Sequence, residues 1–86
     1  MIIRMNSFAN RIMAEHLAGI FLRQGLDVFV RNGNGPFTLA IFGDKAQQVC
    51  SGIVGGMAGI DRFWTSDDEF HKNPASFVNA TEYFGE

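Results

Sequence analysis

A run of turn-forming residues near the middle of the chain places the strongest restriction on the fold. Asparagine and glycine alternate over residues 32–36 and a proline ends the run (Asn-Gly-Asn-Gly-Pro), a composition that favours tight turns. The runs on either side, 27–31 (DVFVR) and 37–42 (FTLAIF), are rich in β-branched and aromatic residues. The pattern therefore predicts a β-hairpin, whose two strands are antiparallel neighbours in one sheet.

An amphipathic helix is predicted before the hairpin, over residues 8–24. Its apolar positions recur at three- and four-residue spacing, which is typical of a helix with one buried face; they are Ile12, Met13, Leu17, Ile20 and Phe21. Gly25 stands where a left-handed residue often ends a helix, and Leu26 follows it in position to contact Phe21. We therefore expect this helix to end in a Schellman motif.

A second helix is predicted after the hairpin, where Asp44 and Gln47 have the spacing of a capping box. Its apolar stripe consists of Ala46, Val49, Cys50, Ile53, Val54, Met57 and Ile60. Four glycines interrupt the second half, and each costs about 1 kcal/mol relative to alanine inside a helix; they are Gly52, Gly55, Gly56 and Gly59. They indicate close packing of the helix, an end near Val54 followed by a loop, or a phosphate-binding loop, although the order GxGxxG is lacking.

Short strands at 1–5 (MIIRM) and 61–65 (DRFWT) complete the pattern. The order strand, helix, strand, strand, helix, strand over residues 1–66 predicts an α+β protein, a ferredoxin-like βαββαβ two-layer sandwich. With 86 residues, the chain has room for a single domain.

Residues 67–86 are predicted to form a C-terminal helical extension, with a turn of helix over 67–72 and a longer helix over 74–84. Residues 1–60 carry five basic and three acidic residues, whereas 61–86 carry six acidic and two basic ones, so the extension is acidic and the rest is basic. Five of its side chains are too apolar to leave in water: Phe70, Phe77, Val78, Tyr83 and Phe84. We expect the extension to pack on the core.

Strand alternation predicts an aromatic and basic face on the sheet. Residues two apart share a face, so the helix side takes the more apolar set, Val28, Val30, Phe37, Leu39, Ile41 and Phe63. The opposite face then carries the candidate binding residues Phe29, Arg31, Phe42, Arg62 and Trp64. Such a surface favours a cover, supplied by the acidic extension, by a partner, or by both. The hairpin tip is a second candidate surface: Asn32, Gly33, Asn34 and Gly35.

No set of catalytic or metal-binding residues stands out. A single cysteine excludes an internal disulfide and a multi-cysteine zinc site. Cys50 lies on the apolar stripe of the second helix, a position typical of a buried, unreactive thiol. The start of the extension carries four residues that could bind a divalent cation: Asp67, Asp68, Glu69 and His71. Acidic residues are also typical of the first turn of any helix. We predict no enzyme activity, no metal and no cofactor.

One family resemblance points the other way. The stretch 4–11 (RMNSFANR), followed by a helix and then Val30-Arg31-Asn32, resembles the phosphate loop and second strand of acylphosphatases, which are ferredoxin-like hydrolases. The resemblance implies that Arg11 binds phosphate and that Asn32 positions water. The stretch lacks the glycine of the family's loop and the aromatic residue before its arginine.

Charge and hydropathy restrict the partners. The net charge of −2 is too small to indicate nucleic-acid binding by bulk attraction, or mimicry of DNA. The apolar stretches are shorter than the roughly 20 residues that span a membrane, and no signal peptide is apparent, so a cytoplasmic protein without a membrane partner is expected.

The function predicted is that of a small non-catalytic protein that binds another macromolecule, a protein in preference, as an inhibitor or adaptor. A homodimer is also possible on this reading of the sequence. Single-strand nucleic-acid binding through the aromatic and arginine-bearing face is one alternative, and acylphosphatase-like hydrolysis is another. In size and build the chain is similar to small phage- or plasmid-encoded inhibitors, of which anti-CRISPR proteins are one kind.

Overall fold

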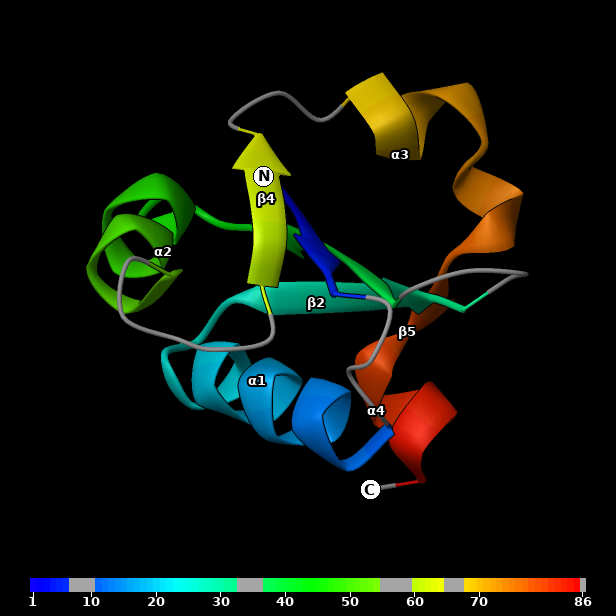
Figure 1. Ribbon diagram of the computed structural model, residues 1–86, viewed down its shortest axis with the longest axis horizontal. Helices are drawn as coiled ribbons and strands as arrows, with labels where there is room; N and C mark the ends of the chain where they lie inside the picture. The colour runs from blue at the N-terminus through cyan, green and yellow to red at the C-terminus, as the bar shows by residue number, and fades with distance from the viewer. Residues whose placement is uncertain (7–10, 33–36, 55–59, 65–67, 86) are drawn as a thin grey trace.

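A computed structural model describes the chain over residues 1–6, 11–32, 37–54, 60–64 and 68–85. Ten elements follow one another in these ranges (Figure 1). They are β1 (Ile2–Met5), α1 (Arg11–Arg23), β2 (Asp27–Arg31), β3 (Thr38–Phe42), α2 (Ala46–Val54), β4 (Ile60–Trp64), α3 (Asp68–Lys72), the 3-10 turn η1 (Pro74–Ser76), β5 (Val78–Asn79) and α4 (Ala80–Phe84).

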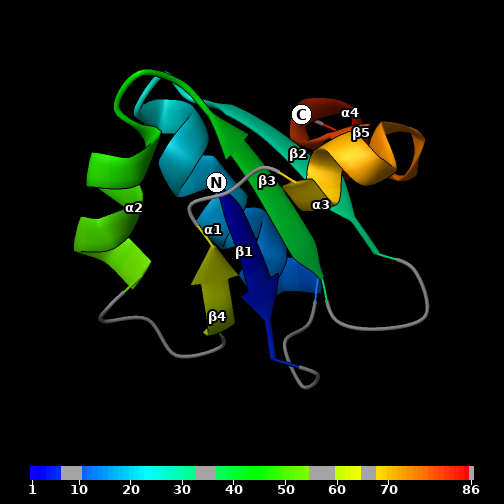
Figure 2. The same cartoon turned by 90° about the horizontal axis from the view of Figure 1, so that it is seen from above.

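The strands form one five-stranded sheet in the order β4-β1-β3-β2-β5, and all neighbours are antiparallel. The predicted hairpin is confirmed, because β2 and β3 pair over five residues from Asp27–Phe42 to Arg31–Thr38. Helices α1 and α2 lie on one face of the sheet, and α3 lies on the other (Figures 1 and 2). The protein is thus a mixed α+β fold, as the sequence predicted.

Helix α1 ends as predicted. Gly25 takes a φ of 82°, its N–H donates to the Leu22 carbonyl at 3.0 Å, and the Leu26 N–H donates to the Phe21 carbonyl at 3.2 Å. These two bonds define a Schellman motif, which satisfies carbonyls left free at the end of a helix. Strand β2 begins directly after this turn, at Asp27.

The buried stripe of α1 differs from the one predicted. Ala14, Leu17, Ala18 and Phe21 face the core, whereas Ile12 is 75% exposed. The two alanines lie on the same side of the helix as Leu17 and Phe21. These four residues form a narrow face that packs on the sheet, and Ile12 lies outside this face. The prediction that Ile12 belongs to the buried face is wrong.

Helix α2 is described as far as Val54, and the stretch in which it would end or continue lies outside the described residues. The other glycines, at 55, 56 and 59, and Met57 lie outside the described residues. Ile60, which the stripe placed on the helix, instead begins β4. A Cβ at Gly52 would meet no atom within 4 Å, so close packing does not explain that glycine.

The sheet buries apolar side chains on both faces. The helix side holds the main cluster, which includes Phe21, Val28, Val30, Leu39 and Ile41. A smaller cluster on the opposite face contains Ile2, Ala40 and Phe77, with Phe29, Phe42 and Phe70 partly buried against it. The alternation predicted for β2 and β3 is therefore confirmed.

The extension does not form the single helix predicted over 74–84. Phe77 has an extended backbone (φ −99°, ψ 144°), and β5 pairs with Phe29 and Val30 of β2 before α4 begins. Asn79 caps α4, because its side chain accepts a hydrogen bond from the Thr81 N–H at 2.9 Å. Pairing with the sheet edge thus outweighs local helix propensity, and Val78, predicted to be buried, is 41% exposed.

The extension passes around the edge of the sheet (Figure 2). Before β5, Phe70 and Phe77 pack on the face opposite α1 and α2. After β5, Ala80 and Phe84 join the main cluster on the helix side. One short strand therefore separates two anchors on opposite faces.

Candidate functional site

The predicted binding face divides into an aromatic half and an arginine half. In the aromatic half, the ring of Phe70 in α3 lies 5.3 Å from Phe29, 5.0 Å from Phe42 and 5.2 Å from Phe77, measured between ring centroids. The Phe29 and Phe42 rings meet edge to face at 5.8 Å. Tilted and edge-on contacts at these distances are the geometry that aromatic pairs prefer.

Phe29 and Phe42 are consequently covered by the chain's own extension. Both are only partly exposed, and Phe77 is buried beside them. The sequence predicted that this face needs a cover, and for these two residues the cover is Phe70 and Phe77.

The arginine half follows one line across the strands. Thr38 in β3 pairs with Arg31 on one side and with Arg4 of β1 on the other, and Arg4 pairs with Arg62 of β4. We call these four positions the arginine row. Residues opposite one another in neighbouring strands share a face, and strands are spaced about 4.8 Å apart, so Arg4 and Arg31 lie roughly 10 Å apart at their Cα atoms.

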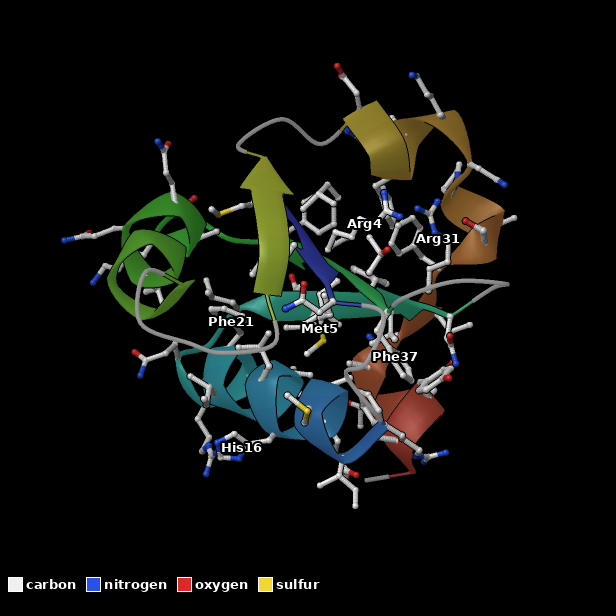
Figure 3. The ribbon with its side chains drawn as sticks, viewed as in Figure 1. Arg4, Met5, His16, Phe21, Arg31 and Phe37 are labelled. Atoms are coloured by element: carbon white, nitrogen blue, oxygen red, sulfur yellow. The ribbon has the colours of Figure 1, made fainter. Side chains whose placement is uncertain are left out.

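The side chains of the row differ in exposure. Arg4 is exposed, Arg31 is partly exposed, and Thr38 between them is only 5% exposed. Figure 3 shows that Arg4 and Arg31 both extend from the sheet toward the side on which α3 lies. Thr38 is thus a buried polar residue whose strand position lies between those of Arg4 and Arg31.

Arg31 connects the two halves. Its Cζ atom lies 4.8 Å from the centroid of the Phe77 ring, which is a cation–π distance. The extension therefore holds Arg31 in place at one end of the row, while Arg4 remains open to solvent.

The remaining two residues of the predicted face lie in β4. Arg62 pairs with Arg4, and Trp64 pairs with Ile2, so the backbone register brings both positions into line with the face. Their side chains lie outside the described residues.

Arg4 and Thr38 were not among the residues predicted for this surface. The available signal was the alternation within 1–5, where Arg4 interrupts an apolar run and shares a face with Ile2. Strand alternation also places Thr38 on the same face as Phe42, because the two positions differ by an even number. The register across three strands, which pairs Arg4 with Thr38, cannot be obtained from any one segment.

The two residues selected by the acylphosphatase resemblance both contact Tyr83. Arg11 donates from Nη2 to the Tyr83 carbonyl at 3.5 Å, and its Cζ lies 5.6 Å and 5.5 Å from the Tyr83 and Phe84 ring centroids. Asn32 donates from Nδ2 to the Tyr83 hydroxyl at 3.4 Å. Both side chains thus bind the extension, while the remaining hairpin-tip residues, Gly33, Asn34 and Gly35, lie outside the described part.

The surface has shallow hollows in which other chemistry could take place. One of about 330 Å³ on the outside of α1 is lined by Glu15, His16, Gly19, Leu22 and Arg23, without a hydroxyl or thiol. Within the described ranges, no three carboxylate, imidazole or thiol groups lie close enough to bind a metal ion together. Asp67 and the side chain of Glu69, from the predicted acidic cluster, lie outside those ranges.

Comparison with known proteins identifies no relative of this chain. No protein-family model matches it, and no curated protein or solved structure does. None of the described helices is both long enough and apolar enough to cross a membrane.

Proposed function

We propose that the chain is a ferredoxin-like βαββαβ sandwich to which β5 and α4 are added. The support is the order β4-β1-β3-β2 within the sheet, together with helices α1 and α2 on one face. In this description, β1-α1-β2 and β3-α2-β4 are two interleaved units.

We further propose that the protein is non-catalytic and binds another protein through the arginine row, acting as an inhibitor or adaptor. The observation that supports this proposal is the pairing of Arg4 with Thr38 and of Thr38 with Arg31 across three strands. Guanidinium groups bind carboxylates through bidentate, charge-assisted hydrogen bonds. The partner surface that fits is therefore an acidic segment, rich in aspartate or glutamate.

A protein partner fits this face better than a nucleic acid. Single-stranded nucleic acids bind sheets largely by stacking bases on exposed aromatic rings. Here Phe29 and Phe42 are already packed against Phe70, so the described aromatic rings of the face are engaged within the chain.

The contacts of Arg11 and Asn32 support the absence of catalysis. A phosphate loop needs its arginine directed at the ligand, whereas the Arg11 guanidinium lies over the Tyr83 and Phe84 rings. Turnover of benzoyl phosphate that disappears in a folded Arg11→Ala protein would instead support the acylphosphatase alternative.

The proposal can be tested by titrating the isotope-labelled protein with a glutamate-rich peptide and recording amide chemical shifts. We expect shifts centred on Arg4, Thr38 and Arg31, and an affinity that falls about tenfold or more in Arg4→Glu, because one strong charge-assisted contact is worth about 1.4 kcal/mol. Thr38→Val, which keeps the side-chain shape, should weaken binding by a smaller factor.

The matched control is Arg23→Glu, because Arg23 is also exposed but lies on α1, on the other side of the sheet. It changes the net charge by the same amount and should leave the affinity unchanged. An equal loss in Arg23→Glu would mean that only net charge matters, and the arginine row would be rejected as the site. An oligothymidine that binds more tightly than the peptide, and only when Arg4 is present, would replace the protein partner with a nucleic acid.

A further inference from the structure

The two edges of the sheet differ in whether another described strand covers them. The outer edge of β2 is paired with β5, and α4 continues from there onto the helix side. The other edge is β4, a five-residue strand that ends the strand order. Figures 1 and 2 both place β4 at the border of the sheet, with no described strand beyond it.

An edge strand presents a row of backbone N–H and C=O groups that can pair with another chain. Proteins often protect such edges with proline or a covering element. Residues 60–64 (IDRFW) contain no proline, and they combine β-branched and aromatic residues. The irregularity in the β1–β4 register lies between Arg4 and Met5, near the Ile60 end, which leaves the Trp64 end regular.

We propose that a second copy of this chain pairs with β4 along this edge, to give a two-fold dimer with a continuous antiparallel sheet. In a two-fold dimer the same strand meets itself. Residues that pair must face the same side of the sheet, so their numbers differ by zero or by an even number. Few registers satisfy both conditions.

Charge selects one register among these. Pairing centred on Asp61 or on Arg62 would place two like charges directly opposite each other, which is unfavourable. Pairing centred on Phe63 places Phe63 opposite Phe63 and Arg62 opposite Trp64, twice. Arginine and tryptophan are a favourable pair. Of the registers that join at least three residues of β4, this one alone opposes no like charges.

The first test is the oligomeric state of the unmodified protein. Sedimentation equilibrium between micromolar and near-millimolar concentration should fit a monomer–dimer equilibrium. Amide exchange in β4 should slow by roughly tenfold at the higher concentration, while amides in the central strand β3 should exchange at the same rate. A monomer throughout, with unchanged β4 exchange, would overturn the proposal.

The second test determines the register. In a Cys50→Ala background, Arg62→Cys and Trp64→Cys proteins are mixed and oxidised with oxidised glutathione. Opposed residues in antiparallel strands have Cα atoms roughly 4.5–5.5 Å apart, which lies within the range a disulfide accepts. We expect the 62–64 disulfide in the mixture to exceed the 62–62 disulfide of Arg62→Cys alone by roughly tenfold or more.

Equal yields of 62–62 and 62–64 disulfides would contradict the register centred on Phe63. The dimer does not depend on the proposed function, because β4 pairing uses backbone groups at the sheet border, whereas peptide binding is tested at Arg4 and Thr38. Peptide binding that persists in a strictly monomeric protein would reject the dimer alone.

Discussion

Gly43 and Gly52 show how differently two glycines of one short segment contribute to the fold. Gly43, between β3 and α2, has a φ of 148°, and a Cβ added there would lie 2.5 Å from Leu26 Cδ2. Gly52 lies inside α2, is exposed, and has open space where a Cβ would lie. Only the first position requires glycine.

Replacement by alanine should therefore have opposite effects at the two positions. Gly43→Ala should lower the free energy of unfolding by roughly 1–3 kcal/mol, because the backbone is in a region that side chains disfavour and Leu26 must move. Gly52→Ala should raise it by roughly 0.5–1 kcal/mol through helix propensity. Urea denaturation of both variants measures the difference, and a stabilised Gly43→Ala would contradict the geometry of this turn.

Single residues also show which features of the site were predictable. Gly25 was assigned correctly because a helix cap is a local signal, carried by neighbours in sequence. Phe29 and Phe42 were assigned to the correct face by alternation alone. Arg4 was not predicted because its place in the arginine row comes from its pairing with Thr38, which is 34 positions away in the chain.

The C-terminal extension is the element that the sequence described least well. Its capping signals favoured a continuous helix over 74–84, whereas the structure has a turn, the strand β5 and the helix α4. The open edge of β2 explains the difference, because it offers backbone hydrogen bonds that no local pattern reveals. The hairpin β2–β3, by contrast, is closed by its own turn and was predicted to within one residue.

Two adjacent residues of the extension should differ strongly in their contribution to stability. Phe77 is 7% exposed and contacts both Phe70 and Arg31, while Val78 beside it points to solvent. Phe77→Ala should cost about 3 kcal/mol of unfolding free energy, and Val78→Ala less than about 1 kcal/mol. Thermal or chemical denaturation of the pair is the measurement. Similar costs for both would mean that the extension is held by β5 alone.

The molecule as a whole forms one compact body. Its Cα radius of gyration is 11.5 Å, close to the roughly 12 Å expected for a folded chain of this length. The extension belongs to that body, since Phe84 lies in the main cluster and Phe77 in the smaller one.

Removing residues 67–86 should therefore affect the entire protein. The deletion uncovers Phe29 and Phe42 and removes Phe70, Phe77 and Phe84, each worth on the order of 1.5–3 kcal/mol when buried. We expect the shortened chain to aggregate or to lose its cooperative unfolding transition, as followed by calorimetry. In the full chain, amides of 77–84 should exchange far more slowly than in an unstructured peptide. A shortened protein that stays soluble and unfolds at the same temperature would contradict this expectation.

The pairing of β5 with β2 also has a consequence for how the protein is made. Phe29 and its partner Asn79 are separated by 50 positions in the chain. At synthesis rates of about 5–20 residues per second, β2 leaves the ribosome roughly 3–10 seconds before its partner strand is complete. During that interval the hydrogen-bonding edge of β2 and the Phe29 ring are accessible to neighbouring nascent chains. Slower translation after residue 31 would lengthen this exposure, so we expect codon choice downstream of β2 to affect the yield of folded protein.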